Sequence, residues 1–147
     1  MEFSGKKVTV VGTGISGIGA VGLLNAVGAE VVLYDGNEKL KIEDIEKKLG
    51  TYKAEIVLGE LTKELTDSSD LLVISPGVPI DSPVVKAFEA AGVPVWGEVE
   101  LAYAFDKGKV LAITGTNGKT TTTALVGQIV GAYHKDTFVV GNIGNPY

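Results

Sequence analysis

The stretch KVTVVGTGISG, residues 7–17, decides the fold that the sequence predicts. Its first part, Lys7–Val11, is a short β-branched run, typical of a strand buried on both faces of a parallel sheet. Three glycines follow in the spacing Gly12-x-Gly14-x-x-Gly17, and a helix is expected from Ser16 to about Gly28. Strand, glycine turn and helix in this order open a βαβ unit.

The same alternation continues along the chain. Further strands are predicted at residues 30–34, 55–58, 71–75 and 93–96. Helices are predicted at residues 39–49, 83–91 and 98–105. Strands that alternate with helices imply a parallel sheet joined by right-handed crossovers. The sequence therefore predicts an α/β fold with a Rossmann-like domain.

Composition restricts the class of protein. The chain has 147 residues, of which 45% are hydrophobic, enough for one packed domain and part of another. The net charge is −5 and no run of Lys or Arg exceeds two residues, which argues against a nucleic-acid partner. The chain has no cysteine, and no apolar run approaches the roughly 20 residues of a membrane span. The N-terminal residues lack a long apolar stretch with a cleavage site, so no signal peptide is expected there. We expect a cytoplasmic protein without a membrane partner.

The first glycine loop is expected to bind phosphate. Glycines let a phosphate approach the backbone, and the helix N-terminus supplies free N–H groups and a partial positive charge. Asp35 ends the second predicted strand, 18 positions after Gly17, where a carboxylate commonly accepts hydrogen bonds from a ribose or a base. The pattern alone leaves three interpretations open: an NAD site, a site for another nucleoside diphosphate, and a turn that serves only strand–helix packing.

A second glycine loop, GTNGKTT, consists of Gly115, Thr116, Asn117, Gly118, Lys119, Thr120 and Thr121. Its successive backbone N–H groups can bind phosphate oxygens, Lys119 would bring a positive charge to the β- and γ-phosphates, and the Thr120 hydroxyl would ligate Mg²⁺. The general pattern has glycine where this chain has Ile113, so the loop is a shortened variant. ATP and Mg²⁺ are the expected ligands.

The second loop defines a second predicted unit. It follows a polar linker at residues 106–109 and comprises a strand at 110–114, a helix at 119–133 and a short strand at 138–140. We therefore expect a Rossmann-like substrate-binding domain at residues 1–107 and the first β-α-β of a P-loop ATPase domain, incomplete, at 108–147.

Five short motifs occur in order along the chain. They are GTGISG at residues 12–17, ISPGVP at 74–79, GEVEL at 97–101, GTNGKTT at 115–121 and GNIGNP at 141–146. Together they resemble the Mur ligases, ATP-dependent amide-forming enzymes of peptidoglycan precursor synthesis, and are most similar to the branch that adds D-glutamate to UDP-N-acetylmuramoyl-L-alanine. Folylpolyglutamate synthases resemble the ATP loop but usually have glycine at the position of Thr120.

The resemblance implies a role for each residue at a matching position. The diphosphate of the UDP carrier would meet Gly14, Ile15, Ser16 and Gly17. The uracil site would be lined by Asp35, Gly36 and Asn37. Further substrate contacts would come from Ser75, Pro76 and Gly77 at the end of the fourth strand, and from Asn142 to the muramoyl sugar or its lactyl-alanyl arm.

The resemblance also implies the chemistry. The alanine carboxylate of UDP-N-acetylmuramoyl-L-alanine is first phosphorylated, and the amine of D-glutamate then attacks the acyl phosphate and expels phosphate. Lys119 would be the catalytic residue, acting with Mg²⁺ and backbone N–H groups by positioning and charge neutralisation. Because the family binds D-glutamate on a C-terminal domain, we expect this chain alone to be a fragment without ligase turnover.

Two other functional classes stay open. An NAD-type oxidoreductase would use the first loop and Asp35, and a regulatory nucleotide-binding module would bind ATP without a UDP ligand. Structural roles are expected for the remaining candidates: His134 at the surface, Trp96 in the core, and Glu98 and Glu100 as acids in a first helical turn, since positions i and i+2 of a helix do not face each other.

Overall fold

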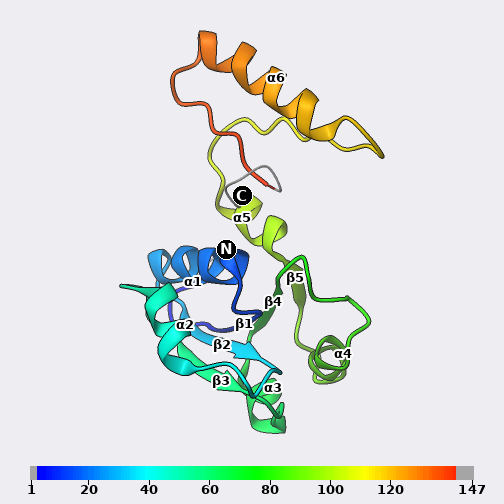
Figure 1. Cartoon of the computed structure of the whole chain (residues 1–147). Helices are drawn as coiled ribbons and strands as arrows, with labels where there is room; N and C mark the ends of the chain where they lie inside the picture. Colours follow the sequence, from blue (N-terminus) through cyan, green and yellow to red (C-terminus); the bar gives the residue numbers. More distant parts are fainter. Residues whose placement is uncertain (1–2, 142–147) are drawn as a thin grey trace. The chain divides into compact units, whose positions relative to one another are not determined.

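The chain folds into two compact units, Met1–Phe105 and Asp106–Tyr147. The computed structural model describes residues 3–141 (Figure 1). Among these residues, no helix is both long enough and apolar enough to cross a membrane.

The first unit is built on a five-stranded sheet in the order β3-β2-β1-β4-β5. The strands are β1 Lys7–Val11, β2 Glu30–Asp35, β3 Glu55–Leu58, β4 Leu71–Ile74 and β5 Val95–Gly97. Every pair of neighbours is parallel, which confirms the predicted α/β class with a Rossmann-like sheet. The chain passes outward from β1 to β3 and then returns to β4 on the other side of β1, so the winding reverses between β1 and β4.

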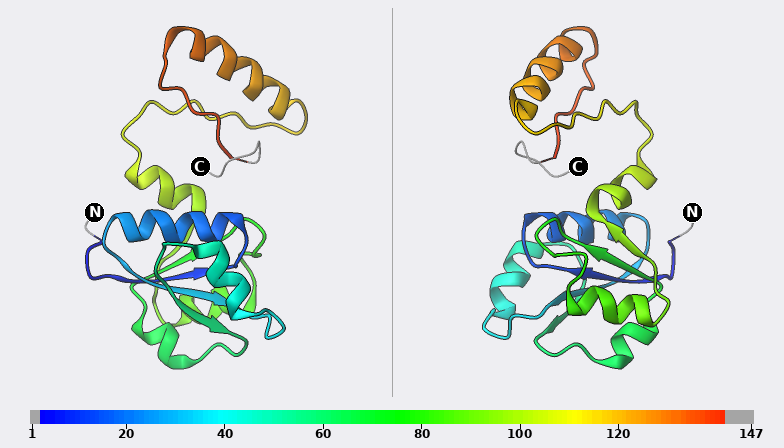
Figure 2. Two further views of the ribbon diagram at one scale, coloured as in Figure 1. Left: turned by 60° about the vertical axis from the view of Figure 1, so that its left-hand side comes forward. Right: turned by 90° about the vertical axis from the view of Figure 1, so that its right-hand side faces the viewer.

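Helices cover both faces of this sheet (Figures 1 and 2). They are α1 Ile15–Ala26, α2 Ile42–Leu49, α3 Lys63–Ser68, α4 Pro83–Ala90 and α5 Glu98–Phe105. Residues of α1, α2 and α5 join the hydrophobic cluster on one face, and residues of α3 and α4 join the cluster on the other. The three layers give the sheet two separate cores.

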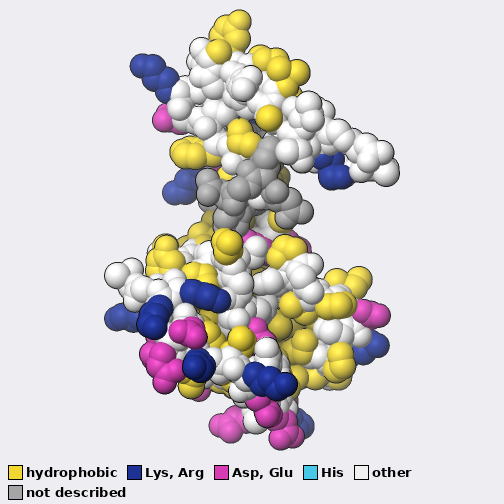
Figure 3. Space-filling view, in the orientation of Figure 1, with side chains coloured by type: hydrophobic (Ala, Val, Ile, Leu, Met, Phe, Trp, Pro, Cys, Tyr) yellow, Lys and Arg dark blue, Asp and Glu magenta, His cyan; other side chains and the backbone are white. Residues whose placement is uncertain are grey.

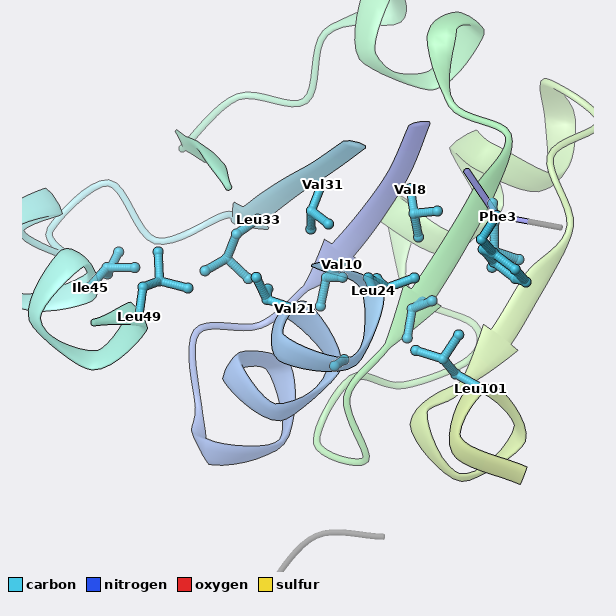
Figure 4. Close-up of a cluster of buried hydrophobic side chains, with 13 residues drawn as sticks. Phe3, Val8, Val10, Val21, Leu24, Val31, Leu33, Ile45, Leu49 and Leu101 are labelled. Carbon is cyan, nitrogen blue, oxygen red and sulfur yellow. The ribbon is translucent and has the colours of Figure 1, made fainter. Parts of the chain in front are cut away.

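Strand β1 shows why both faces need helices. Val8 and Val10 lie in the cluster with α1, whereas Val11 lies in the cluster with α4. All three side chains are buried, as expected for a central parallel strand with apolar residues at successive positions. Figure 4 shows Val8 and Val10 on the side of Leu24 from α1.

The structure differs from the sequence prediction in two local features of the first unit. Helix α3 was not predicted; it begins after Thr62, whose hydroxyl accepts a hydrogen bond from the Leu65 amide (3.3 Å). Helix α2 begins at Ile42 rather than Lys39, because the preceding residues form a turn in which the Asn37 side chain accepts a hydrogen bond from the Lys39 amide (3.1 Å).

The second unit contains helix α6, Lys119–Tyr133. The prediction of strands at residues 110–114 and 138–140 is wrong, because neither segment is paired in a sheet among the described residues. The second of them nevertheless packs along the helix: a Cβ on Gly127 would lie 2.4 Å from Val139 Cγ2. A strand needs a hydrogen-bonded neighbour, and the described part of this unit offers none.

Helix α6 has no buried residue, although its sequence carries an apolar stripe. Its Leu125 and Ile129 are exposed, and Tyr133 is 83% exposed. Figure 3 shows hydrophobic side chains at the surface of this unit. The described residues therefore form the helix of the predicted β-α-β unit, and residues 138–140 pack on this helix without forming a strand.

We predict that the first unit depends on the core between α1 and the sheet. Leu24→Ala, at a fully buried position, should lower the free energy of unfolding by about 2–5 kcal/mol, because it removes buried methyl groups and leaves a cavity. Ile80→Ala, at a position that is 78% exposed, is the control and should change it by less than about 0.5 kcal/mol. Urea unfolding measures both, and equal effects would contradict the assignment of the core.

Candidate functional site

The first glycine loop lies at the carboxyl edge of the sheet, where the winding reverses. Val11, the last residue of β1, is in register with Tyr34 of β2 and Ile74 of β4. The Gly12 amide donates to the Tyr34 carbonyl (2.9 Å), and the Ser75 amide donates to the Val11 carbonyl (3.2 Å). Open parallel sheets bind ligands at this point, outside the carboxyl ends of their strands.

The three glycines of the loop are present for different physical reasons. Gly12 has φ +107°, a conformation that other residues rarely adopt. A Cβ on Gly17 would lie 1.9 Å from the Gly12 carbonyl oxygen, so only glycine allows α1 to approach β1 this closely. Gly14 has φ −77°, and its Cβ would meet nothing within 4 Å. Neither strain nor packing within the described protein requires glycine at position 14.

Helix α1 presents an uncapped N-terminus at this loop. Its N-cap residue is Gly14, no side chain caps the helix, and its first turn contains no acidic residue. The first intrahelical hydrogen bond runs from the Ile18 amide to the Gly14 carbonyl (3.0 Å). The amides of Ile15, Ser16 and Gly17 precede it and lack helical acceptors, so they can donate to an anion.

Asp35 holds the glycine loop from the end of β2. Its Oδ2 accepts hydrogen bonds from the Thr13 amide (3.3 Å) and the Thr13 hydroxyl (3.0 Å), and its Oδ1 accepts one from the Asn37 amide (3.1 Å). Thr13 is only 7% exposed, whereas Gly36 and Asn37 are exposed beside the carboxylate. The structure thus gives Asp35 a local partner that the sequence had not indicated; its contact with a ribose or base stays a prediction.

Lys48 brings a cation to the loop. Its Nζ, from α2, donates to the Thr13 carbonyl oxygen (3.4 Å). Lys48 was not among the predicted site residues, because nothing in the sequence distinguishes it from the other lysines of α2. The neighbouring Lys47 instead pairs with Asp44 of the same helix (3.6 Å). A positive charge this close to an uncapped helix N-terminus adds to the attraction for an anion.

Ser75 directs an unpartnered hydroxyl toward the loop. Its Oγ is buried and has no hydrogen-bond partner among the described residues. The same oxygen would lie 3.0 Å from a Cβ on Gly12 and 3.3 Å from a Cβ on Gly17. A buried polar atom without a partner costs about 1–3 kcal/mol, so such atoms usually mark a contact made by a ligand or water. Pro76 and Gly77, which follow it, are exposed.

Glu98 and Glu100 have different environments. Glu100 is exposed, whereas Glu98 is only 7% exposed. Burial raises the pKa of the Glu98 carboxyl, and the nearby Ser16 hydroxyl opposes this only in part. The expected structural roles are confirmed for Trp96, whose ring lies 6.1 Å from that of Phe3, and for the exposed His134.

The second loop is organised around Lys119. The Lys119 ammonium donates to the carbonyl oxygens of Gly115 (2.6 Å) and Thr116 (3.4 Å). Gly118 is the N-cap of α6 with φ +76°, no side chain caps this helix, and its first turn has no acidic residue. Asn117, Thr120 and Thr121 are exposed.

Within residues 3–141 there is no group of three or more acidic or histidine side chains that could hold a metal ion. The predicted substrate residue Asn142 lies outside the described residues.

Residues 6–97 match the sequence model of the family described as Mur ligase MurD-like, N-terminal domain. The match covers more than half of the chain and includes the glycine loop, Asp35 and Ser75. The chain belongs to this family. Its MurD-like domain thus contains most of the residues that the resemblance had placed at the UDP carrier.

The names of similar proteins agree with this family assignment. Proteins from Lachnospira eligens and Lachnoclostridium phytofermentans are 67% and 57% identical to it, and each is named UDP-N-acetylmuramoylalanine--D-glutamate ligase. Both alignments cover 100% of this chain and 33% of the relative, so the chain spans about a third of the length of these relatives.

A solved structure shares the fold. The pseudomurein peptide ligase type C from Methanothermus fervidus is 28% identical, with a TM-score of 0.55 over 86% of this chain and 26% of that chain. The MurD-like sheet and its glycine loop are therefore similar to part of a ligase of known structure.

We predict that Gly17 and Gly14 differ in their importance for stability. Gly17→Ala should lower the free energy of unfolding by about 1–3 kcal/mol or more, because its methyl group would overlap the Gly12 carbonyl. Gly14→Ala should change it by less than about 1 kcal/mol, since the site is open and the backbone suits alanine, although alanine is a poorer N-cap than glycine. Thermal and urea unfolding of both variants test this, and a Gly14→Ala destabilised as much as Gly17→Ala would show that packing explains both glycines.

Proposed function

We propose that the MurD-like domain of this chain binds the UDP part of UDP-N-acetylmuramoyl-L-alanine. The whole protein would then be an ATP-dependent ligase that adds D-glutamate to the alanyl carboxylate. The observation that carries the proposal is Gly14: a glycine that the fold does not need, in open space at an uncapped helix N-terminus. The unpartnered Ser75 hydroxyl lies near Gly12 and Gly17 of the same loop. A diphosphate that contacts the backbone at Gly14 explains all of these features.

The parts of the UDP carrier follow the edge of the sheet. The diphosphate would accept hydrogen bonds from the amides of Ile15, Ser16 and Gly17 and from Ser75 Oγ. The uracil and ribose would lie at the end of β2, near the half-buried Asp35 and the exposed Gly36 and Asn37, whose exposure leaves room for a ligand. Because Asp35 already accepts from Thr13, it would bind the base or ribose with its remaining lone pairs. The muramoyl-sugar side of the ligand would be contacted by Pro76, Gly77 and Asn142.

The second unit would hold ATP and Mg²⁺. The glycine conformations of Gly115 and Gly118 and the uncapped N-terminus of α6 suit a phosphate, and Lys119 already lies against the loop carbonyls. Lys119 would move from those carbonyls to the β- and γ-phosphates, and Thr120 would be a ligand of Mg²⁺. When bound, ATP supplies the phosphoryl group that activates the alanyl carboxylate for attack by D-glutamate.

Each ligand would bind to a different part of the protein. Residues 1–107 would be the UDP-substrate domain and residues 108–147 the start of the ATP-binding domain. D-Glutamate would bind on a part of the protein outside this chain, so we expect the chain alone to bind substrate without turnover. Such a ligase, with water-soluble nucleotide substrates, would work in the cytoplasm.

Calorimetry with UDP-N-acetylmuramoyl-L-alanine tests the proposal. The wild-type chain should bind this ligand and not NAD. Gly14→Ala should weaken binding at least about tenfold, because its Cβ would occupy the space where the diphosphate approaches the backbone. Equal or tighter binding of NAD would contradict the proposal and favour an oxidoreductase-type domain. ATP binding without UDP-ligand binding would favour a regulatory module.

Lys48 should strengthen the same complex through its charge. Lys48→Gln should weaken binding of the UDP ligand about 3- to 10-fold at low salt and should reduce the salt dependence of the affinity. Lys47→Gln is the matched control, since Lys47 is adjacent in α2 but pairs with Asp44. If both variants had the same effect, Lys48 would contribute only to the general charge of the helix.

A further inference from the structure

Tyr34 joins the glycine loop to the turn that follows β3. It lies in β2, and its carbonyl oxygen accepts a hydrogen bond from the Gly12 amide (2.9 Å). Its ring is buried in the hydrophobic cluster that contains residues of α3 and α4. Its hydroxyl donates to the carbonyl oxygen of Gly59, the residue directly after β3 (2.7 Å). The backbone and the side chain of one residue thus connect two loops at the carboxyl edge of the sheet.

Gly59 is bonded through both of its backbone groups to the end of β2. Its carbonyl accepts from Tyr34, and its amide donates to the Asp35 carbonyl oxygen (2.9 Å). Gly59 has φ +88°, and a Cβ here would lie 2.6 Å from Glu38 Cγ, so the Glu38 side chain lies directly against the glycine. The turn after β3 therefore contacts the segment that follows β2 through both the backbone and a side chain.

The same segment contains the residues proposed to bind uracil. Gly36 lies against the Tyr34 hydroxyl, because a Cβ on Gly36 would be 3.6 Å from the hydroxyl oxygen. Asn37 makes exposed hydrogen bonds within the segment, from its amide to Asp35 Oδ1 (3.1 Å) and to its Oδ1 from the Lys39 amide (3.1 Å). The bond from the Tyr34 hydroxyl is buried and joins β2 to the turn after the next strand. Local bonds shape the segment, and the Tyr34 hydroxyl fixes its place on the sheet.

The hydrogen bond from Tyr34 depends on a single proton. Burial raises the pKa of the Tyr34 hydroxyl, and the charge of Asp35 raises it further, so the hydroxyl remains a donor at neutral pH. Tyr34→Phe would remove this donor from the buried Gly59 carbonyl and keep the ring in the hydrophobic cluster. The substitution therefore changes the link between the two strand ends and little else.

We propose that Tyr34 is a positioning residue for recognition of the base. Uracil presents an N–H donor next to a carbonyl acceptor, whereas cytosine presents an acceptor next to an amino donor, so hydrogen bonds from a fixed segment can separate the two. Such recognition requires that residues 35–37 are held to within about 0.5 Å. The Tyr34 hydroxyl holds them through Gly59. This inference rests on the proposed UDP site.

Calorimetry of the whole chain with UDP and with CDP tests this role. The wild type should bind UDP at least about tenfold more tightly than CDP. Tyr34→Phe should lower this preference at least about threefold, mainly by weakening UDP binding, because the base-binding segment is no longer fixed. Tyr103→Phe, which removes a hydroxyl from a side chain that is 65% exposed, is the matched control and should keep the preference. A loss of stability alone would weaken both nucleotides equally and leave their ratio unchanged.

The outcomes separate this inference from the proposed function. Equal affinity of the wild type for UDP and CDP, or an unchanged preference in Tyr34→Phe, would overturn the role of Tyr34 and leave the diphosphate site intact. Absence of UDP binding to the wild type would overturn the UDP site and the inference with it.

Hydrogen exchange of the wild type decides the question if Tyr34→Phe does not fold. Coupling between two events is reciprocal, so a base that needs the Gly59 link should in turn stabilise that link. Saturating UDP should therefore slow exchange of the Gly59 amide more than saturating CDP does. Equal exchange rates in the two complexes would contradict the role of Tyr34.

Discussion

The close approach of α1 to the end of β1 determines the geometry of the site. At Gly17 the helix comes so near to the Gly12 carbonyl that even a methyl group would overlap it. This contact makes the loop between strand and helix short and directs the N-terminus of α1 at the carboxyl edge of the sheet. The parallel register of β1 with β2 and β4 then places Asp35 and Ser75 on either side of the same loop.

The residues around the loop divide between those that shape it and those that are left for a ligand. Asp35 and Lys48 bond to Thr13, so part of their effect is to fix the loop. Gly14 and the Ser75 hydroxyl have no such structural task among the described residues. That division is the physical basis for placing a diphosphate here.

Much of the fold could be predicted from sequence, because its signals are local. The β-branched run at Lys7–Val11, the glycine spacing and the alternation of strands with helices gave the central sheet and its class. Helix α3 was missed because it is short, with Thr62 as its main local signal. The strands expected at residues 110–114 and 138–140 failed for the opposite reason: their composition suits a strand, but pairing depends on neighbours that the described part of the unit does not supply.

The candidate site could be predicted only in part. The glycine loop, Asp35 and Ser75 follow strand ends, and strand ends of a parallel sheet meet at one edge whatever the details of packing. Lys48 and Glu98 could not be found in this way. Lys48 resembles any other lysine of a surface helix, and the burial of Glu98 depends on how α5 packs on α1, which no local pattern encodes.

The most direct test of the central claim is an amide NMR titration of the chain with UDP-N-acetylmuramoyl-L-alanine. The amide resonances of Ile15, Ser16 and Gly17 should shift first and most, because their N–H groups would donate to the diphosphate, while that of Lys119 should stay unchanged. Shifts confined to other parts of the chain, with these three loop amides unaffected, would contradict the claim that this loop binds the UDP carrier.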